Sequence, residues 1–486
     1  MALQHVRLEG ITLNSEGPGP LYRQLCDEIV SQITSGILGP GDILPPSRQL
    51  SKDLAIGRTT VIQAYDILKS NMHLESKPGI GTYVSFSKRD HKKAPPEKAS
   101  HVADEHMGLS RYASNFKLFG CSPEPDTQMA FLPGMPDIES FPADLFGRYL
   151  SKYAKKSRPE TSCYGYEGGW PKLKTELVRH LAISRGIKCH EDNVVIVTSA
   201  QSALNTLSLV LADPNDVALL ENPFYPGAKM AMENAGLRIK PVEVDDNGAD
   251  IETALEQHPN AKLIYLTPTS QYPLCKTLSL TRRKQLLKHA KKSGLWIMED
   301  DYDSEFRFTK RPVASLKSMD DQGKVIYIGS FSKTLLPGFR VGYMVLPDSL
   351  SNVVKNVVWQ TAIEPALPLQ AAIADFMMDG HYNKHLRRMR QLYKKRHDLL
   401  VKQLGSSFPR NIPITPITGG MNLPVLLAPE YNDQAIVDLL SKENITARAL
   451  SGYSFGDTVY NGLFLGFSCV NEADIKAGVS HILKAL

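Results

Sequence analysis

Short apolar runs alternate with helical stretches through most of this chain, and this alternation limits the folds open to it. Between residues 125 and 486 the runs are four to six residues long, which suits buried strands. Such runs between helices are typical of an α/β fold with a largely parallel central sheet, which binds ligands at the carboxyl ends of its strands. The strand-like runs are 193–198, 217–220, 263–267, 295–299 and 325–329.

Two charged residues fall at the carboxyl ends of these predicted strands. Asp300 follows the run 295–299, and Lys333 follows the run 325–329 within Ser-Phe-Ser-Lys. A lysine amine can form an imine with the aldehyde of pyridoxal phosphate, and an aspartate can keep the pyridine nitrogen protonated so that the ring remains an electron sink. A lone lysine after a strand is more often a surface residue. Together with Asp300, it predicts a pyridoxal-phosphate site in which Lys333 is the catalytic residue.

Hydroxyl, amide and guanidinium groups near these residues suit the phosphate of such a cofactor. Ser330, Ser332 and Arg340 would hold it by neutral and charge-assisted hydrogen bonds. Ser199, Ala200 and Gln201 follow another predicted strand and open a helix, where amide donors and the positive end of the helix dipole attract phosphate. For Ser199 alone, simple capping of that helix is an equally good interpretation.

Aromatic and polar side chains are expected around the ring of the cofactor. Tyr225 is a candidate to stack on the ring, although an aromatic residue flanked by prolines is often part of the core. Tyr302 is expected to bond the 3-hydroxyl group. Ser270, Gln271 and Tyr272 are expected along the other edge of the ring.

The first 86 residues carry a different pattern. Apolar residues recur at helical spacing in 21–33, and further helices are expected after Pro46 and over 58–70. The stretch 77–84 is typical of a hairpin with a glycine-rich tip. These elements suit either a protein-interaction module or a DNA-binding head whose third helix directs Arg and hydroxyl side chains at the major groove. The expected DNA contacts are Arg48, Arg58, Thr59, Thr60, Lys77, Gly79 and Gly81.

Composition excludes several other classes of protein. A net charge of +5 is too mild to indicate nucleic-acid binding by itself. No apolar run approaches the roughly 18 to 20 residues of a membrane span, and no secretory segment opens the chain, so a cytoplasmic protein without membrane contact is expected. The six cysteines include no Cys-x-x-Cys pair, which predicts neither a disulfide framework nor a metal site.

Specific motifs make residues 1–86 resemble a GntR-type winged helix-turn-helix domain. They are GDILPPSRQL at 41–50, GRTTV at 57–61 and GIGTYV at 79–84. The following stretch, 87–124, is polar and rich in lysine and shows no sustained periodicity, which predicts a flexible linker.

Residues 125–486 resemble a fold type I aminotransferase domain, through the stretches 164–165, 220–223, 299–306 and 330–343. The order of winged helix, linker and aminotransferase domain is that of MocR-type regulators. The resemblance implies a head-to-tail homodimer whose two heads read paired half-sites on double-stranded DNA. It also implies that the large domain senses a small-molecule effector, which would be an amine, an amino acid or pyridoxal phosphate itself.

Three positions depart from the aminotransferase pattern. Phe464 stands where such enzymes usually place an arginine that clamps the substrate carboxylate. Residues 272–275 are Tyr-Pro-Leu-Cys where Pro-Thr-Gly is common, and Ser199 replaces a usual glycine. At the position where the γ-aminobutyrate-sensing regulator resembling this chain uses an arginine, this chain has Gly452. Arg448 lies nearby in the sequence but is not assumed to replace that arginine. The missing clamp argues against ordinary amino-acid transamination and leaves room for an unusual amine, a peptide or pyridoxal phosphate as the signal.

Three functions remain open at this point. The favoured one is a pyridoxal-phosphate-dependent transcriptional regulator that uses its aminotransferase-like domain as a sensor. A working aminotransferase with a fused DNA-binding head would instead turn over an amino donor at ordinary enzyme rates. A plain DNA-binding repressor whose large domain only dimerises would lack the absorbance of a lysine-bound cofactor.

Overall fold

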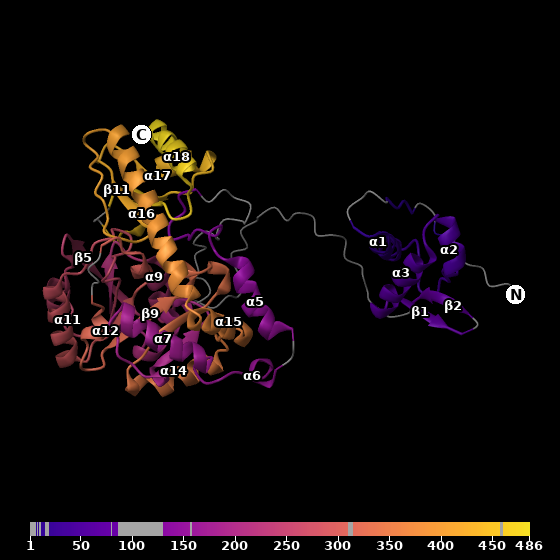
Figure 1. Ribbon diagram of the computed structural model, residues 1–486, viewed down its shortest axis with the longest axis horizontal. Helices are drawn as coiled ribbons and strands as arrows, with labels where there is room; N and C mark the ends of the chain where they lie inside the picture. The colour runs from indigo at the N-terminus through magenta and orange to yellow at the C-terminus, as the bar shows by residue number, and fades with distance from the viewer. Residues whose placement is uncertain are drawn as a thin grey trace. The chain divides into compact units, whose positions relative to one another are not determined.

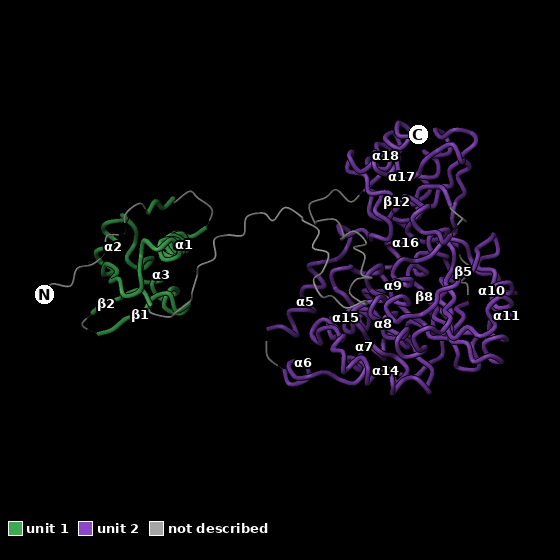
Figure 2. Tube along the Cα trace, turned by 180° about the vertical axis from the view of Figure 1, so that it is seen from behind, with its two compact units in different colours: residues 1–108 green, residues 109–486 purple. Residues whose placement is uncertain are grey.

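The computed structural model describes residues 6, 8, 11–14, 19–78, 80–85, 130–155, 158–309, 314–456 and 460–486. The chain divides into two compact units, residues 1–108 and residues 109–486 (Figure 2). The predicted linker at 87–124 lies outside the described residues.

Unit 1 contains the three helices and the hairpin that its sequence pattern predicts. The helices are α1 (Leu21–Thr34), α2 (Ser47–Asp53) and α3 (Arg58–Ser70), and β1 (Leu74–Lys77) pairs antiparallel with β2 (Gly81–Val84). Val61, Tyr65 and Leu68 belong to the buried stripe of α3. The Tyr65 hydroxyl donates a 2.8 Å hydrogen bond to the Pro45 carbonyl, which ties α3 to the segment before α2.

Unit 2 is built on an eight-stranded sheet with the order β3-β10-β9-β8-β7-β4-β5-β6. β9, β8, β7, β4 and β5 run parallel, whereas β10 is antiparallel to both of its neighbours and β6 is antiparallel to β5. The prediction of a largely parallel sheet is confirmed, and the five predicted runs correspond to β3, β4, β7, β8 and β9. The bounds are β3 (Val194–Val197), β4 (Val217–Asn222), β5 (Arg238–Asp245), β6 (Gly248–Ala249), β7 (Leu263–Leu266), β8 (Trp296–Asp300), β9 (Val325–Ser330) and β10 (Gly342–Val345).

Helices cover both faces of this sheet (Figure 1). On β9, Ile326 and Ile328 join the apolar core beneath α8, α9 and α14. Tyr327, between them, belongs to the core beneath α7, α15 and α16, and Val325 to the core beneath α10 and α11. Because successive side chains point to opposite faces and both faces are buried, the strands are continuous apolar runs in the sequence.

The helices of unit 2 have the following bounds. They are α5 (Ala143–Ala154), α6 (Pro159–Ser162), α7 (Pro171–Ser184), α8 (Ala200–Leu211), α9 (Pro226–Asn234), α10 (Ile251–Gln257), α11 (Leu280–Ser293), α12 (Leu316–Met319), α13 (Phe331–Thr334), α14 (Asp348–Gln360), α15 (Leu367–Met378), α16 (His381–Ser407), α17 (Asp433–Lys442) and α18 (Glu472–Ala485). Four 3-10 turns are η1 (Glu191–Asn193), η2 (Ser304–Phe306), η3 (Pro337–Phe339) and η4 (Leu450–Tyr453) among the described residues.

A smaller layer is formed by the C-terminal part of the chain. β11 (Asn422–Leu426), β13 (Gly462–Gly466) and β12 (Arg448–Ala449) form an antiparallel sheet in the order β11-β13-β12. The 27-residue helix α16 runs from the large sheet to this layer, where it packs against α18 (Figure 1). Within the described ranges, no helix is long and apolar enough to cross a membrane. No group of His, Cys, Asp and Glu in the same ranges could hold a metal ion.

Candidate functional site

Lys333 lies in the short helix α13, which begins where β9 ends. The Ser330 hydroxyl caps this helix by accepting a 3.0 Å hydrogen bond from the Ser332 N–H. The Lys333 amine donates a 2.7 Å hydrogen bond to the Gly134 carbonyl. Burial lowers the pKa of Lys333, although two nearby carboxylates oppose this effect. More of this lysine is therefore the neutral, nucleophilic amine than is usual for an exposed lysine.

Asp300 ends β8, the strand next to the one that leads to Lys333. It is buried, and its carboxylate accepts a 2.8 Å hydrogen bond from the Tyr265 hydroxyl on β7. Burial raises the pKa of Asp300 to about 7, although the Tyr265 hydrogen bond and the Lys333 charge act against the rise. An additional cation beside this carboxylate would keep it ionised at neutral pH, and a protonated pyridine nitrogen is such a cation.

The N-terminus of α8 lies at the same edge of the sheet, because β3 and β9 run in the same direction on either side of β10. The Ser199 hydroxyl accepts a 3.1 Å hydrogen bond from the amide three residues later, so this side chain does cap α8. A Cβ atom on Gly342 would lie 2.9 Å from the Ser199 carbonyl carbon and 3.1 Å from the Ala200 nitrogen. β10 therefore passes directly against the helix start. The Gln201 side chain donates a 2.9 Å hydrogen bond to the Gly227 carbonyl and ties α8 to α9.

Arg340 follows the turn η3 with a left-handed backbone, φ 51°. A non-glycine residue costs about 1 kcal/mol or more in this conformation, so the surrounding structure must hold it there. Burial raises the pKa of Tyr225 to about 12, and the Arg340 charge opposes that rise. The Arg340 charge thus acts on the Tyr225 hydroxyl, and the two side chains belong to the same site.

Four tyrosines form one wall of the site. The Tyr225 and Tyr265 rings stack at 6.3 Å with an interplanar angle of 23°. Tyr272 lies edge-on to Tyr225 at 5.2 Å and to Tyr302 at 6.0 Å. The Tyr302 hydroxyl lies 3.4 Å from the Ser270 hydroxyl. The structure thus brings together four of the five residues that the sequence placed around a ring, Tyr225, Tyr302, Ser270 and Tyr272. The fifth, Gln271, is buried, and its amide donates a 2.8 Å hydrogen bond to the Pro223 carbonyl.

The sequence pattern did not predict three residues of the site. Gly134 lies 199 positions before the lysine that it contacts, and Tyr265 lies inside an apolar strand. Asp303 is buried, and its Oδ2 atom has no hydrogen-bond partner among the described residues. Burial raises the pKa of Asp303 to about 8. The row of acidic residues after β8 was the only available signal for it.

In unit 1, the first turn of α3 presents the predicted DNA contacts. Arg58 and Thr59 are exposed and Thr60 is half-buried, while Arg48 is exposed on α2. No described side chain caps α3. The first amides of this helix therefore remain able to bind an anion such as a DNA phosphate.

The hairpin of unit 1 carries the other predicted contacts. Lys77 and Gly81 face each other at the ends of β1 and β2, and both are exposed. Gly79, between them, lies outside the described residues. The Tyr83 hydroxyl donates a 3.0 Å hydrogen bond to the Glu75 carboxylate, which links the two strands.

Two family models match this chain. The model for bacterial regulatory proteins of the gntR family matches residues 21–84, and the model for aminotransferases of class I and II matches residues 149–482. The probable rhizopine catabolism regulatory protein MocR of Rhizobium meliloti is 32% identical over 479 residues, which are 98% of this chain and 95% of that protein. The chain belongs to the MocR-type regulators of the GntR family.

Further relatives agree with this membership. The HTH-type transcriptional regulator TauR of Rhodobacter capsulatus is 30% identical and the match covers 82% of each protein. The crystal structure of kynurenine aminotransferase from Pyrococcus horikoshii has a TM-score of 0.72 and 25% identity, over 79% of this chain and 98% of that one. This MocR-type regulator therefore joins a GntR DNA-binding domain to a fold type I aminotransferase-like domain, and its cofactor is pyridoxal phosphate.

The residues of this MocR-type regulator fit that cofactor. Asp300 ends β8 and Lys333 follows the adjacent parallel strand β9, so the two can meet an aldehyde and a ring nitrogen on one small molecule. A Cβ atom on Gly134 would lie 2.9 Å from the Lys333 Nζ atom, so glycine there leaves space beside the amine. The buried Asp303 carboxylate supplies a further polar group whose Oδ2 atom lacks a described partner.

The departures from the aminotransferase pattern also appear in the structure of the MocR-type regulator. Phe464 is buried in β13 and packs edge-on against Tyr272 at 5.2 Å. Cys275, where the aminotransferase pattern has glycine, keeps a left-handed backbone with φ 56°. Arg448 lies opposite Phe464 in the strand register, and its side chain is exposed. Phe464, which the resemblance sets at the position of the usual carboxylate clamp, therefore takes part in an aromatic contact.

Proposed function

We propose that this MocR-type regulator senses an amine-containing effector at Lys333 and converts that event into a change in DNA affinity. The observation that carries the proposal is the buried Lys333 amine, which has a lowered pKa and lies beside Asp300 in a chain that also has a winged-helix head. Pyridoxal phosphate supplies an aldehyde and an electron-withdrawing ring when it is bound. The effector amine would displace the lysine from that aldehyde.

Each predicted residue has a separate part in holding the cofactor. Asp300 keeps the proton on the ring nitrogen, and Tyr225 stacks on the ring. The Tyr302 hydroxyl, which lies near that of Ser270, bonds the 3-hydroxyl group. The phosphate is held by the hydroxyls of Ser330 and Ser332, by the Arg340 guanidinium and by the start of α8 at Ser199, Ala200 and Gln201.

The aromatic contact at Phe464 supports an effector that does not depend on a carboxylate clamp. Phe464 and Tyr272 are in contact with each other. Because both are uncharged aromatic side chains, neither offers a cation to an α-carboxylate. Asp303 is a buried carboxyl group on the lysine side of the site, and because its pKa is about 8, a cationic amine beside it would favour its ionised form. A buried carboxyl group there suits a ligand with an amino group better than a dianionic one.

We also infer a homodimer whose two heads read paired half-sites. Tyr164 is 94% exposed, and its ring lies edge-on to the partly exposed Trp359 at 6.4 Å. Adjacent exposed aromatic side chains are common in protein–protein contacts. A head-to-tail arrangement would present one DNA-binding head from each subunit to the two halves of an operator.

The test is an absorbance titration of the purified full-length protein with added pyridoxal phosphate. Wild type and Lys333→Ala are compared while a panel of amines and amino acids is added. DNA affinity is measured on the same samples with an operator selected from a random duplex library. We expect a lysine-dependent band that one panel member shifts without turnover, together with a change in DNA affinity.

Other outcomes would point to the other functions. Turnover of an amino donor at ordinary enzyme rates would favour an active aminotransferase. A band that no amine shifts, with DNA affinity that follows the concentration of pyridoxal phosphate alone, would make the cofactor itself the signal. Unfolding of Lys333→Ala, checked by circular dichroism, would show that the main role of this lysine is structural.

A further inference from the structure

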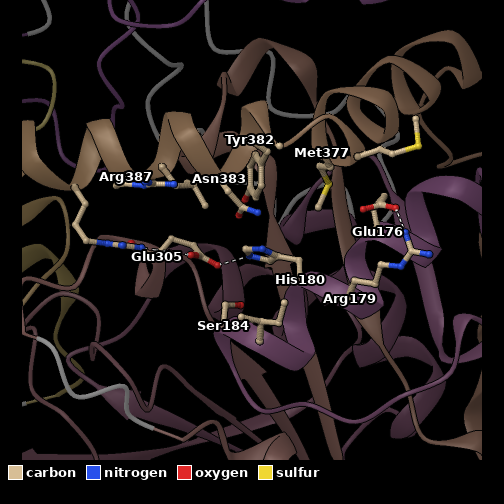
Figure 3. A pocket seen from close by; sticks show the side chains of 14 residues that line it. Glu176, Arg179, His180, Ser184, Glu305, Met377, Tyr382, Asn383 and Arg387 are labelled. Atoms are coloured by element: carbon tan, nitrogen blue, oxygen red, sulfur yellow. Dashed lines mark hydrogen bonds and ion pairs between the residues drawn. The ribbon is translucent and has the colours of Figure 1, made fainter.

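A second cavity lies outside the cofactor site, between helices α7 and α16 (Figure 3). Its volume is about 550 Å³, which is enough for a small organic molecule. Arg179 and His180 come from α7, Arg387 and Arg390 from the first turns of α16, and Glu305 from η2. We refer to this cavity as the α7–α16 pocket.

Both carboxylates that line the α7–α16 pocket already have polar partners. Glu176 lies 2.6 Å from the Arg179 guanidinium, and Glu305 lies 2.6 Å from His180 Nε2. Arg390 adds a 2.9 Å hydrogen bond to the Glu305 carbonyl. Burial alone would raise the pKa of Glu305, but the hydrogen bond and charge of His180 lower it overall, so this carboxylate is ionised at neutral pH.

Two other polar groups in the pocket lack partners. Arg387 is exposed on α16 and forms no ion pair with any described residue. The Ser184 hydroxyl, at the end of α7, is buried and has no hydrogen-bond partner in the described part of the chain. Figure 3 shows Arg387 on the α16 side and Ser184 on the α7 side of the His180–Glu305 pair. A ligand with an anionic head group would pair with the exposed Arg387 guanidinium, whereas the Ser184 hydroxyl lies beneath the surface of the pocket.

Apolar side chains complete the lining. Ile183 and Met378 are 89% and 55% exposed, and both border the pocket. Leu386 and the ring of Tyr382 form buried apolar surface beside them. A short hydrocarbon body would cover these side chains and remove their surface from water.

We propose that the α7–α16 pocket is a second ligand site, which binds a small organic anion with an apolar body. The anionic head pairs with Arg387, and the apolar body covers Ile183 and Met378. Carboxylates and phosphate monoesters share the chemistry that this site recognises.

The pocket is connected to the cofactor site through its own lining. Glu305 belongs to the segment that follows Asp300 at the end of β8. Ser184 precedes Arg185, whose buried guanidinium lies 2.7 Å from Asp301. The Tyr382 ring packs at 5.8 Å against Phe331, in the helix that carries Lys333. A ligand that moves these side chains therefore acts on both ends of the cofactor site.

The test is calorimetric titration of the full-length protein loaded with pyridoxal phosphate. The probes are hexanoate, hexyl phosphate and hexylammonium, which share one hydrocarbon body and differ in the head group. We expect saturable binding of one or both anions and none of the cation. Arg387→Ala should weaken anion binding about tenfold or more, because it removes a charge-assisted hydrogen bond.

Three controls keep the proposal falsifiable. Arg388→Ala removes the adjacent exposed arginine, which does not line the pocket, and should leave affinity unchanged. Ser184→Ala should leave affinity nearly unchanged, because its hydroxyl is buried beneath the pocket surface. If Arg340→Ala abolishes anion binding while Arg387→Ala does not, the anion occupies the cofactor's phosphate site and the proposal fails. The same conclusion follows if no anion binds saturably or if Arg387→Ala matches wild type.

The connection between the α7–α16 pocket and the cofactor site can be measured in the same samples. Saturating anion should change the visible absorbance or the affinity of the bound cofactor in wild type and in Arg388→Ala, but not in Arg387→Ala. Binding without any such change would support the α7–α16 pocket as a ligand site. It would contradict the connection to the cofactor site through Glu305 and Tyr382.

Discussion

The Tyr265 hydroxyl donates a 2.8 Å hydrogen bond to the Asp300 carboxylate, and both residues are buried. They come from adjacent parallel strands, β7 and β8. The hydrogen bond acts against the rise in the pKa of Asp300 that burial causes. It therefore favours the ionised form of the carboxylate that would hold a protonated ring nitrogen, and it fixes the position of that carboxylate.

Tyr265→Phe should weaken the binding of pyridoxal phosphate without unfolding the protein. The change removes one hydrogen bond to a buried carboxylate, which corresponds to roughly tenfold in affinity. Titration of cofactor-free protein, followed by absorbance, measures this change. Tyr149→Phe is the matched control. The Tyr149 hydroxyl also donates a hydrogen bond to a carboxylate, that of Asp379 at 2.6 Å, and neither residue belongs to the cofactor site. Equal affinities for the two variants would contradict the role assigned to Tyr265.

Asp300→Asn should change how stability depends on pH. The pKa of Asp300 is about 7 in the folded protein, against an ordinary value of 3.8. Between these values the folded state binds more protons than the unfolded state, so this carboxyl group makes the folded state progressively less stable as pH rises. We expect the stability of Asp300→Asn relative to wild type, without cofactor, to increase from about pH 4 to about pH 7 and then level off.

Thermal unfolding at several pH values measures this difference. Other buried carboxyl groups, such as Asp303, are present in both proteins and so contribute equally to first order. Added pyridoxal phosphate should reduce the pH dependence of wild type, since the ring cation lowers the pKa of Asp300. A difference between the two proteins that stays constant from pH 4 to pH 8 would show that Asp300 titrates normally.

The sequence predicted the two central residues of the site because a parallel sheet gathers the ends of its strands at one edge. Asp300 and Lys333 each follow an apolar run. The parallel pairing of the two strands is therefore enough to bring these residues to the same edge of the sheet. Tyr265 and Gly134 were not predicted, because their contacts with these residues cross between strands or between distant segments. No periodicity distinguishes a tyrosine whose hydroxyl bonds a buried carboxylate from one that fills a core.

The direction of a side chain was the second feature that the sequence did not predict. Gln201 was correctly placed at the start of a helix, yet its amide group bonds the Gly227 carbonyl on α9. The direction of a strand was the third feature that the sequence did not predict. β10 is antiparallel to β9, although its four residues are as apolar as those of the parallel strands. Position along the chain determines which residues lie near the site, but rotamers and strand direction depend on packing partners.

Asp301→Asn should destabilise unit 2 strongly. The Asp301 carboxylate lies 2.7 Å from Arg185 Nε, and both side chains are almost completely buried. It also accepts a 2.6 Å hydrogen bond from the Tyr327 hydroxyl. Removing the negative charge leaves the arginine charge buried without its partner, which costs about 3 to 5 kcal/mol in such pairs. Urea denaturation, followed by tryptophan fluorescence, measures the shift of the unfolding midpoint.

The matched control for this pair is Asp398→Asn. Asp398 pairs with Lys394 on α16, and both side chains are more than half exposed. Asp398 also lies 3.0 Å from His397 Nδ1, and asparagine can keep this hydrogen bond. Exposed pairs of this kind contribute about 1 kcal/mol or less. Equal shifts for Asp301→Asn and Asp398→Asn would mean that burial does not strengthen the Arg185–Asp301 pair.

Arg58→Ala should weaken operator binding and reduce its dependence on salt. Arg58 is exposed on the first turn of α3, where no described side chain caps the helix. A phosphate contact releases about one counterion on binding, so its loss should reduce the slope of log affinity against log salt by about one. Lys69→Ala is the control from the other end of the same helix, where the amine pairs with Asp66 at 3.2 Å. If Arg58→Ala instead relaxes base preference at one operator position with an unchanged salt slope, Arg58 reads a base edge rather than a phosphate.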